Sequence, residues 1–131
     1  EPENVNGKKI LVVGGGDSAI ESALLLKNQN KVTLVYRGEV FARLKPANLE
    51  QIRKAIEEES IQVMFNTNPV RIDREQVSLL NQVSGTELAI ANDFVYIFAG
   101  GELPTRFLEK TGIGITKKFG EALLTHHKKN G

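Results

Sequence analysis

The stretch Lys9-Ile-Leu-Val-Val-Gly-Gly-Gly-Asp-Ser-Ala-Ile-Glu-Ser-Ala-Leu-Leu-Leu26 predicts a strand, a tight glycine turn and a helix. Residues 10–13 form a continuous apolar run in which three of the four side chains are β-branched. Such a run is typical of a strand buried on both faces of a parallel sheet. Three glycines end the run, and apolar residues then recur with helical spacing. These residues are Ala19, Ile20, Ala23 and Leu24.

The glycine spacing Gly14-x-Gly16-x-x-Ala19 matches the fingerprint of dinucleotide-binding proteins. Gly14 allows a sharp turn, Gly16 lets a pyrophosphate approach the main chain, and Ala19 lets the helix pack closely on the strand. The first helical turn has free N–H groups and the positive end of the helix dipole, and both attract phosphate. We therefore expect a dinucleotide at this turn, against the alternative of a turn that is only structural.

Length and composition fit one soluble globular domain, since the chain has 131 residues, of which 40% are apolar and 25% charged. The net charge of +1 gives no reason to expect nucleic acid as a partner. The chain has no cysteine and therefore no disulfide, thiolate metal site or redox dithiol. No apolar stretch approaches the roughly 20 residues that span a bilayer. We expect a cytoplasmic protein without a membrane or metal partner.

The first half of the chain predicts alternating strands and helices. Residues 32–36 form a second β-branched run, and the helical connection before it makes this strand parallel to the first. Pro46 sits where a helix can start, and apolar spacing continues the helix to about Ser60. Residues 61–65 follow as a third short strand. This β-α-β-α-β order predicts the mononucleotide-binding half of a Rossmann-like α/β sheet.

The middle of the chain changes to alternating apolar and polar residues, which predicts an antiparallel three-stranded β-meander. The three pairs that carry this pattern are Val70 and Ile72, Val77 and Leu79, and Leu88 and Ile90. Residues 94–99 form another continuous apolar run, expected as the last parallel strand, and residues 105–110 a short helical piece. After Thr116 we expect irregular chain, disordered at its end.

Three motifs in this order resemble the NAD(P)-binding domain of the pyridine nucleotide-disulfide oxidoreductases, on the thioredoxin reductase side of that superfamily. They are the glycine loop 14–21, the basic segment from Val35 to Arg43, and residues 98–105, Phe-Ala-Gly-Gly-Glu-Leu-Pro-Thr. The resemblance spans about Lys8 to Gly120 and implies that these motifs bind the cofactor. The expected cofactor-binding residues are Gly14, Gly15, Gly16, Asp17, Ser18, Ala19, Glu21, Tyr36, Arg37, Arg43, Ala99, Gly100 and Gly101.

The sequence also departs from that family. The family's nucleotide domain is inserted in an FAD-binding domain with its own glycine fingerprint, whereas this chain has one fingerprint and no Cys-x-x-Cys. We therefore divide the chain into a linker, residues 1–7, a nucleotide-binding domain, residues 8–120, and a polar tail, residues 121–131, which we expect to be disordered. The chain is expected to be a domain of a larger protein, or a lone nucleotide-binding module.

The residues after the second strand favour NADP over NAD. An NAD or FAD site usually has an acidic residue there, and an S-adenosylmethionine site would also require one. Here Tyr36 and Arg37 occupy the place, and a guanidinium pairs with a 2′-phosphate. The alternative for Arg37 and Arg43 is a solvated basic loop, with Glu39 between them as a possible ion-pair partner. Tyr36 has two equal interpretations, stacking on adenine or covering the sheet edge.

Two acidic residues of the first helix have competing roles. Asp17 at the helix start is expected to cap the helix rather than contact the ligand through its side chain. Glu21 is either a surface residue or, as the resemblance implies, a residue near the nicotinamide. The adjacent pair His126 and His127 lacks a third ligand and makes a poor zinc site.

The sequence predicts an NADP(H)-binding domain of a flavin-dependent, thioredoxin reductase-like oxidoreductase. It would hold the nicotinamide for hydride transfer to an FAD carried by a separate flavin-binding domain of the parent protein. The chain shows no general base, nucleophile or metal cluster, so we expect no catalytic residue, no bound flavin and no reductase activity from the chain alone. The alternative is a non-catalytic module that senses dinucleotide or acts as a scaffold.

Overall fold

The computed structural model describes residues 6–41, 43–98, 113–118 and 121–126, the last two ranges by their backbone alone. The helices are α1 (Asp17–Leu26) and α2 (Pro46–Glu57). The strands are β1 (Lys9–Val13), β2 (Lys31–Val35), β3 (Ile61–Met64), β4 (Thr67–Ile72), β5 (Gln76–Asn81), β6 (Glu87–Ala91), β7 (Phe94–Ile97), β8 (Ile113–Lys118) and β9 (Glu121–His126). Residues 99 and 105–110, for which we expected the end of a strand and a short helix, lie outside these ranges.

The strands form two sheets, and their order confirms the fold expected from the sequence. The larger sheet has the order β3-β2-β1-β7-β9-β8, and its first four strands are parallel. The smaller sheet is the antiparallel meander β4-β5-β6, which precedes β7 in the chain. Because β2 and β7 flank β1 on opposite sides, the chain reverses its direction of travel across the sheet at β1. In open α/β sheets such a reversal point is where ligands bind, at the carboxyl ends of the strands.

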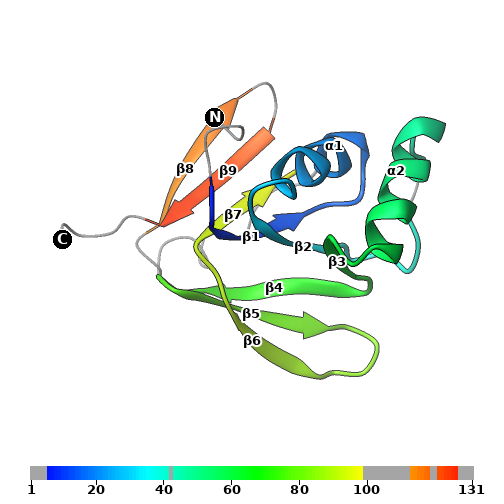
Figure 1. Cartoon of the computed structure of the whole chain (residues 1–131). Coiled ribbons are helices and arrows are strands. Elements are labelled where there is room, and N and C mark those ends of the chain that lie inside the picture. The colour runs from blue at the N-terminus through cyan, green and yellow to red at the C-terminus, as the bar shows by residue number, and fades with distance from the viewer. Residues whose placement is uncertain (1–5, 42, 99–112, 119–120, 127–131) are drawn as a thin grey trace.

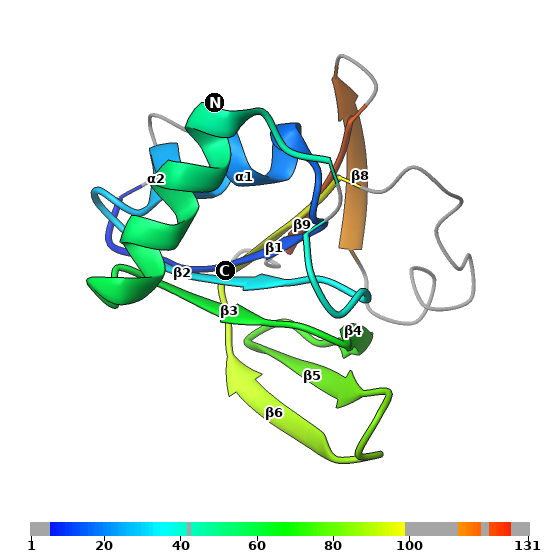
Figure 2. The same ribbon diagram turned by 90° about the vertical axis from the view of Figure 1, so that its right-hand side faces the viewer.

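The larger sheet is covered by helices on one face and by the meander on the other, as both ribbon views show (Figures 1 and 2). Alternate residues of each parallel strand serve the two layers, since side chains along a strand point to opposite faces. The layer under the helices contains Ile10, Val12, Val32, Leu34 and Tyr96, together with Ile20 and Ile52 of the helices. The layer over the meander contains Leu11, Val35, Val95 and Ile97, together with Ile72, Val77 and Leu79. Burial on both faces explains why these strands read as continuous apolar runs.

The chain was expected to be irregular after Thr116, and the structure differs from that expectation. The structure has two strands there, and β9 pairs antiparallel with β7 and with β8. The positions paired directly with β7 run from Ala122 to Thr125, so the main sheet continues past residue 120. The hydrogen bonds of these strands are made by the backbone and do not depend on side-chain polarity. The domain boundary at residue 120 stays a prediction, and residues 127–131 lie outside the described ranges.

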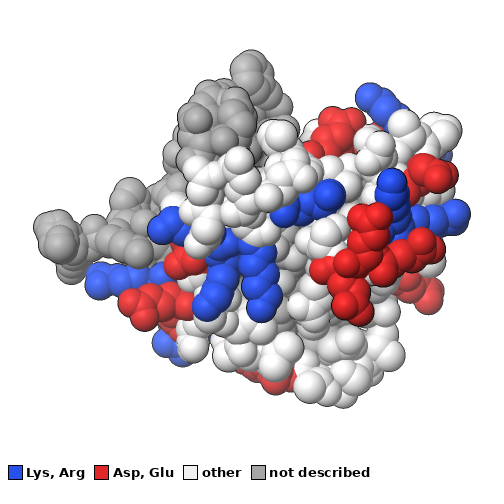
Figure 3. Space-filling view, in the orientation of Figure 1, with Lys and Arg blue, Asp and Glu red and all other residues white. Residues whose placement is uncertain are grey.

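Charged side chains of both signs lie on the surface (Figure 3). Figure 3 shows Asp and Glu side chains gathered over the region of α2, whose C-terminal end runs into the acidic sequence Glu57-Glu58-Glu59. Lys and Arg side chains gather near the middle of the same face. Within the described residues, no helix is long and apolar enough to cross a membrane.

Candidate functional site

The glycine turn begins where β1 ends, between the ends of β2 and β7. The Gly14 N–H donates to the carbonyl oxygen of Val35 at 2.9 Å, and the Phe98 N–H donates to that of Val13 at 2.8 Å. Gly14 has a φ of 141°, in the region that L side chains rarely adopt. A Cβ added to Gly14 would lie 2.7 Å from the carbonyl oxygen of Phe98 and 3.1 Å from the Cβ of Ala19. Gly14 is therefore required by the turn itself.

Gly16 is different, because its backbone needs no glycine. It is the N-cap residue of α1 with φ −94° and ψ −178°, an extended conformation open to any residue. A Cβ added there would meet no atom of the described structure within 4 Å. No side chain of the described residues caps the helix at this end. The exposed turn thus leaves space and N–H donors for an anion, while Ala19 behind it is fully buried against the sheet.

Tyr36 packs onto the glycine turn rather than projecting into solvent. Its ring lies so close to Gly15 and Gly38 that a Cβ at either residue would come within 2.6 Å of a ring carbon. The ring also stacks on Phe41, with the ring centroids 6.2 Å apart, and Phe41 meets Phe65 edge-on at 4.9 Å. Gly15 and Gly38 therefore make room for the Tyr36 ring, and its two expected roles, stacking on adenine and covering the sheet edge, stay predictions.

The two arginines of the predicted 2′-phosphate site lie on the exposed segment between β2 and α2. Arg37 directly follows Tyr36, and Arg43 lies two residues before the N-cap of α2. Both side chains are exposed. Among the described residues, neither arginine forms an ion pair with Glu39. Glu39 is therefore not paired with either arginine in this conformation, and the pairing of Arg37 and Arg43 with a phosphate stays a prediction.

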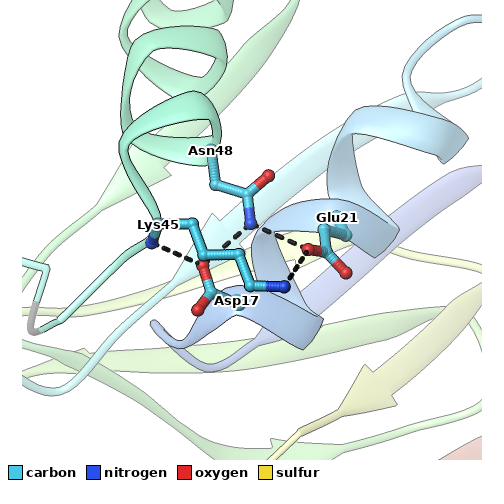
Figure 4. A network of polar contacts seen from close by, with 4 residues as sticks. All are labelled: Asp17, Glu21, Lys45 and Asn48. Atoms are coloured by element: carbon cyan, nitrogen blue, oxygen red, sulfur yellow. Dashed lines mark hydrogen bonds and ion pairs between the residues drawn. The ribbon is translucent and has the colours of Figure 1, made fainter.

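Asp17 and Glu21 turn toward α2, as Figure 4 shows. The Asp17 Oδ1 accepts hydrogen bonds from the Lys45 N–H at 2.9 Å and from the Asn48 Nδ2 at 2.8 Å. The Glu21 Oε2 accepts from the same Asn48 Nδ2 at 2.8 Å and lies 4.0 Å from the Lys45 Nζ. The expected helix cap at Asp17 is therefore wrong for α1, since Gly16 is the N-cap and Asp17 bonds to the start of α2 instead.

Hydrogen bonding keeps the Asp17 carboxylate ionised. The Asn48 side chain and then the Lys45 N–H lower the pKa of Asp17 below its ordinary value, because both donors favour the charged form. Burial opposes this shift slightly, and the positive charge of Lys45 adds to it. Lys45 and Asn48 were not predicted as site residues from the sequence. The sequence did contain a signal for Asn48. Pro46 marks the start of α2, so Asn48 is the third residue of that helix, a position whose side chain often takes part in capping.

Of the remaining expected site residues, the structure describes Ser18. Ser18 is exposed in the first turn of α1, two residues after Gly16. Ala99, Gly100 and Gly101 lie outside the described residues. Within the described ranges, no group of three or more His, Cys, Asp or Glu side chains is arranged to hold a metal ion. A small cavity at the opposite end of the strands, beside Lys9 and Lys31, is separate from the glycine turn.

The chain belongs to the pyridine nucleotide-disulphide oxidoreductase family, whose model matches residues 1–130. A ferredoxin–NADP reductase of Thermus thermophilus is 37% identical over 100 residues, which cover 72% of this chain and 29% of the relative. A thioredoxin reductase of Bacillus subtilis is 33% identical over 113 residues, covering 82% of this chain and 34% of the relative. The chain thus spans about a third of the length of these relatives.

Solved structures show the same relationship. A bacillithiol disulfide reductase of Staphylococcus aureus superimposes with a TM-score of 0.73 at 27% sequence identity, covering 98% of this chain and 40% of that one. A thioredoxin reductase of Streptococcus pyogenes superimposes with a TM-score of 0.63 at 26% identity, covering 76% of this chain and 33% of that one. The chain is therefore related to flavoprotein oxidoreductases that use pyridine nucleotides, as the sequence predicted.

Proposed function

We propose that this chain is the NADP(H)-binding part of a thioredoxin reductase-like flavoprotein oxidoreductase. The observation that carries the proposal is the open space at Gly16, at the N-terminus of α1 and at the point where the sheet reverses its strand order. A pyrophosphate in that space would accept hydrogen bonds from the first turn of α1 and gain from the helix dipole. The backbone conformation at Gly16 does not require glycine, and the absence of a side chain keeps this space free for a pyrophosphate.

The role of the chain in the reaction is binding and orientation. The nicotinamide supplies the hydride, and an FAD held outside this chain would receive it. The glycine turn would fix the pyrophosphate, and Arg37 and Arg43 would hold the 2′-phosphate. The segment that includes Ala99, Gly100 and Gly101 is proposed to complete the cofactor site, and Glu21 to lie toward its nicotinamide end.

NADP is proposed as the preferred cofactor over NAD. Both arginines are exposed, so each pairing with the 2′-phosphate is discounted to about 1 kcal/mol for screening by solvent. Two such contacts correspond to a preference on the order of tenfold or more. No acidic side chain holds either arginine in an ion pair within the described structure, which supports their availability for the phosphate.

The substitution Gly16→Val tests whether a dinucleotide binds at this turn. The Gly16→Val variant should fold normally, because the added Cβ meets no described atom and the backbone conformation is ordinary, but it should bind NADP at least tenfold more weakly. Titration calorimetry measures the affinity, and a thermal melt without ligand checks the fold. Asn28→Val, at an exposed residue beyond the other end of α1, is the matched control and should keep the wild-type affinity. Unchanged NADP binding by a folded Gly16→Val variant would show that no dinucleotide lies on this turn.

A further inference from the structure

The segment that carries the two arginines, residues 37–45, is held at three places. Backbone hydrogen bonds fix its beginning, where the Asn66 N–H donates to the Gly38 carbonyl oxygen at 3.0 Å and the Thr67 N–H donates to that of Tyr36 at 3.0 Å. The ring of Phe41 fixes its middle, between Tyr36 and Phe65. Its end is fixed by the hydrogen bond from the Lys45 N–H to Asp17.

The hydrogen bond that fixes the end of this segment depends on Asp17, a residue of α1. Lys45 is the N-cap of α2 and makes no side-chain cap of its own, and Pro46 after it has no N–H to donate. The Asp17 carboxylate takes the place of a cap, because it accepts from the N-cap N–H and from the side chain at the third helical position, Asn48. A negative charge at this place is also favoured by the dipole of α2.

We propose that Asp17 is a positioning residue for cofactor choice, which holds the Arg37–Arg43 segment beside the glycine turn and thereby sets the preference for NADP over NAD. The inference rests on the proposed dinucleotide site. Asp17 is adjacent to Gly16, where the pyrophosphate would lie, and only Leu44 lies between Arg43 and Lys45, whose backbone N–H donates to Asp17. The Asp17 side chain therefore connects the proposed pyrophosphate site to the proposed 2′-phosphate site. Its partner Lys45 lies 28 residues further along the chain.

The geometry separates this role from direct ligand binding. The Asp17 Oδ1 is engaged by two donors, both from the segment that begins α2. A carboxylate near the dinucleotide would repel both nucleotides, and NADP more strongly because its 2′-phosphate adds negative charge, so loss of this repulsion alone would raise the NADP-over-NAD ratio or leave it unchanged. Loss of the hold on Lys45 acts only through the arginines, and only NADP has the phosphate that they would contact. The ratio of the two affinities therefore isolates the positioning role.

The experiment compares Asp17→Ala with Asp17→Asn by titration calorimetry with NADP and with NAD. Asparagine keeps an oxygen that accepts both hydrogen bonds, whereas alanine keeps none. We expect Asp17→Ala to lower the NADP-over-NAD affinity ratio three- to tenfold and Asp17→Asn to keep it near the wild-type value. Hydrogen exchange of the Lys45 amide, measured without ligand, should accelerate in Asp17→Ala and stay protected in Asp17→Asn.

Two further variants make the outcome decisive. Asn48→Ala removes the second donor to Asp17 and should lower the ratio in the same direction, which keeps the test available if Asp17→Ala fails to fold. Glu50→Ala, an exposed change on α2 outside the network, should leave the ratio unchanged. A wild-type ratio that persists in folded Asp17→Ala or Asn48→Ala would overturn this inference alone. A wild-type chain that binds neither nucleotide would instead overturn the proposed function.

Discussion

Replacing Gly14 with alanine tests whether Gly14 is needed for the fold while Gly16 is needed for the ligand. The new Cβ would lie 2.7 Å from the Phe98 carbonyl oxygen, a backbone atom at the end of β7 that cannot move without disturbing the β1–β7 pairing. The residue would also have to keep a φ of 141°, which L side chains rarely adopt. The backbone conformation costs about 1–3 kcal/mol and the overpacking another 1–3 kcal/mol or so.

The expected loss for Gly14→Ala is therefore about 2–6 kcal/mol of unfolding free energy, a large part of the roughly 5–15 kcal/mol of a typical domain. Urea denaturation followed by circular dichroism measures it, with the slope against urea checked for constancy. Gly16→Ala is the matched control, and its loss should stay below about 1 kcal/mol, since only the N-cap preference changes. Equal stabilities of Gly14→Ala and Gly16→Ala would refute the assignment of Gly14 to the fold and of Gly16 to the ligand.

Two more predictions concern charged side chains of the site. Arg37→Ala should weaken NADP binding about fivefold and leave NAD binding within twofold, by calorimetry, whereas Arg53→Ala on the exposed side of α2 should change neither; equal losses for both nucleotides would show that Arg37 does not contact the 2′-phosphate. The lowered pKa of Asp17 means that its stabilising contribution is fully present above the ordinary value of 3.8 and is lost as pH falls through the lowered pKa. The difference in unfolding free energy between wild type and Asp17→Asn should therefore be constant at neutral pH and change only in that acidic range, and a change near pH 6 would contradict this reasoning.

The parallel sheet, its helices and the meander could be predicted from the sequence, because the pattern of apolar residues in each strand or helix shows which of its faces are buried. Residues 10–13 and 32–36 are apolar on both faces, and the structure buries β1 and β2 between the helices and the meander. The alternating pattern of residues 70–90 gave the meander, because only one face of that small sheet meets the core. The strand β9 was missed, since its place between β7 and β8 depends on backbone pairing with strands far away in the sequence.

The candidate site was predictable where a residue acts through its own backbone. The spacing of Gly14, Gly16 and Ala19 placed a turn after β1, and the structure adds that Gly14 is fixed by a carbonyl oxygen while Gly16 faces open space. Side chains that act through partners were not predictable in the same way. Asp17 was expected to cap its own helix, yet its hydrogen-bond partners lie 28 and 31 residues away.

The sequence by itself determined the order of strands and helices up to β7, the glycine turn and the basic segment after β2, because hydrophobic periodicity and glycine spacing are local properties of the chain. Only the tertiary structure decided that Tyr36 packs on Gly15 and that Asp17 holds the start of α2. The physical reason is that a hydrogen bond or ring contact needs two groups within a few ångströms. For groups remote in sequence, that proximity arises only when the sheet and its helices have assembled.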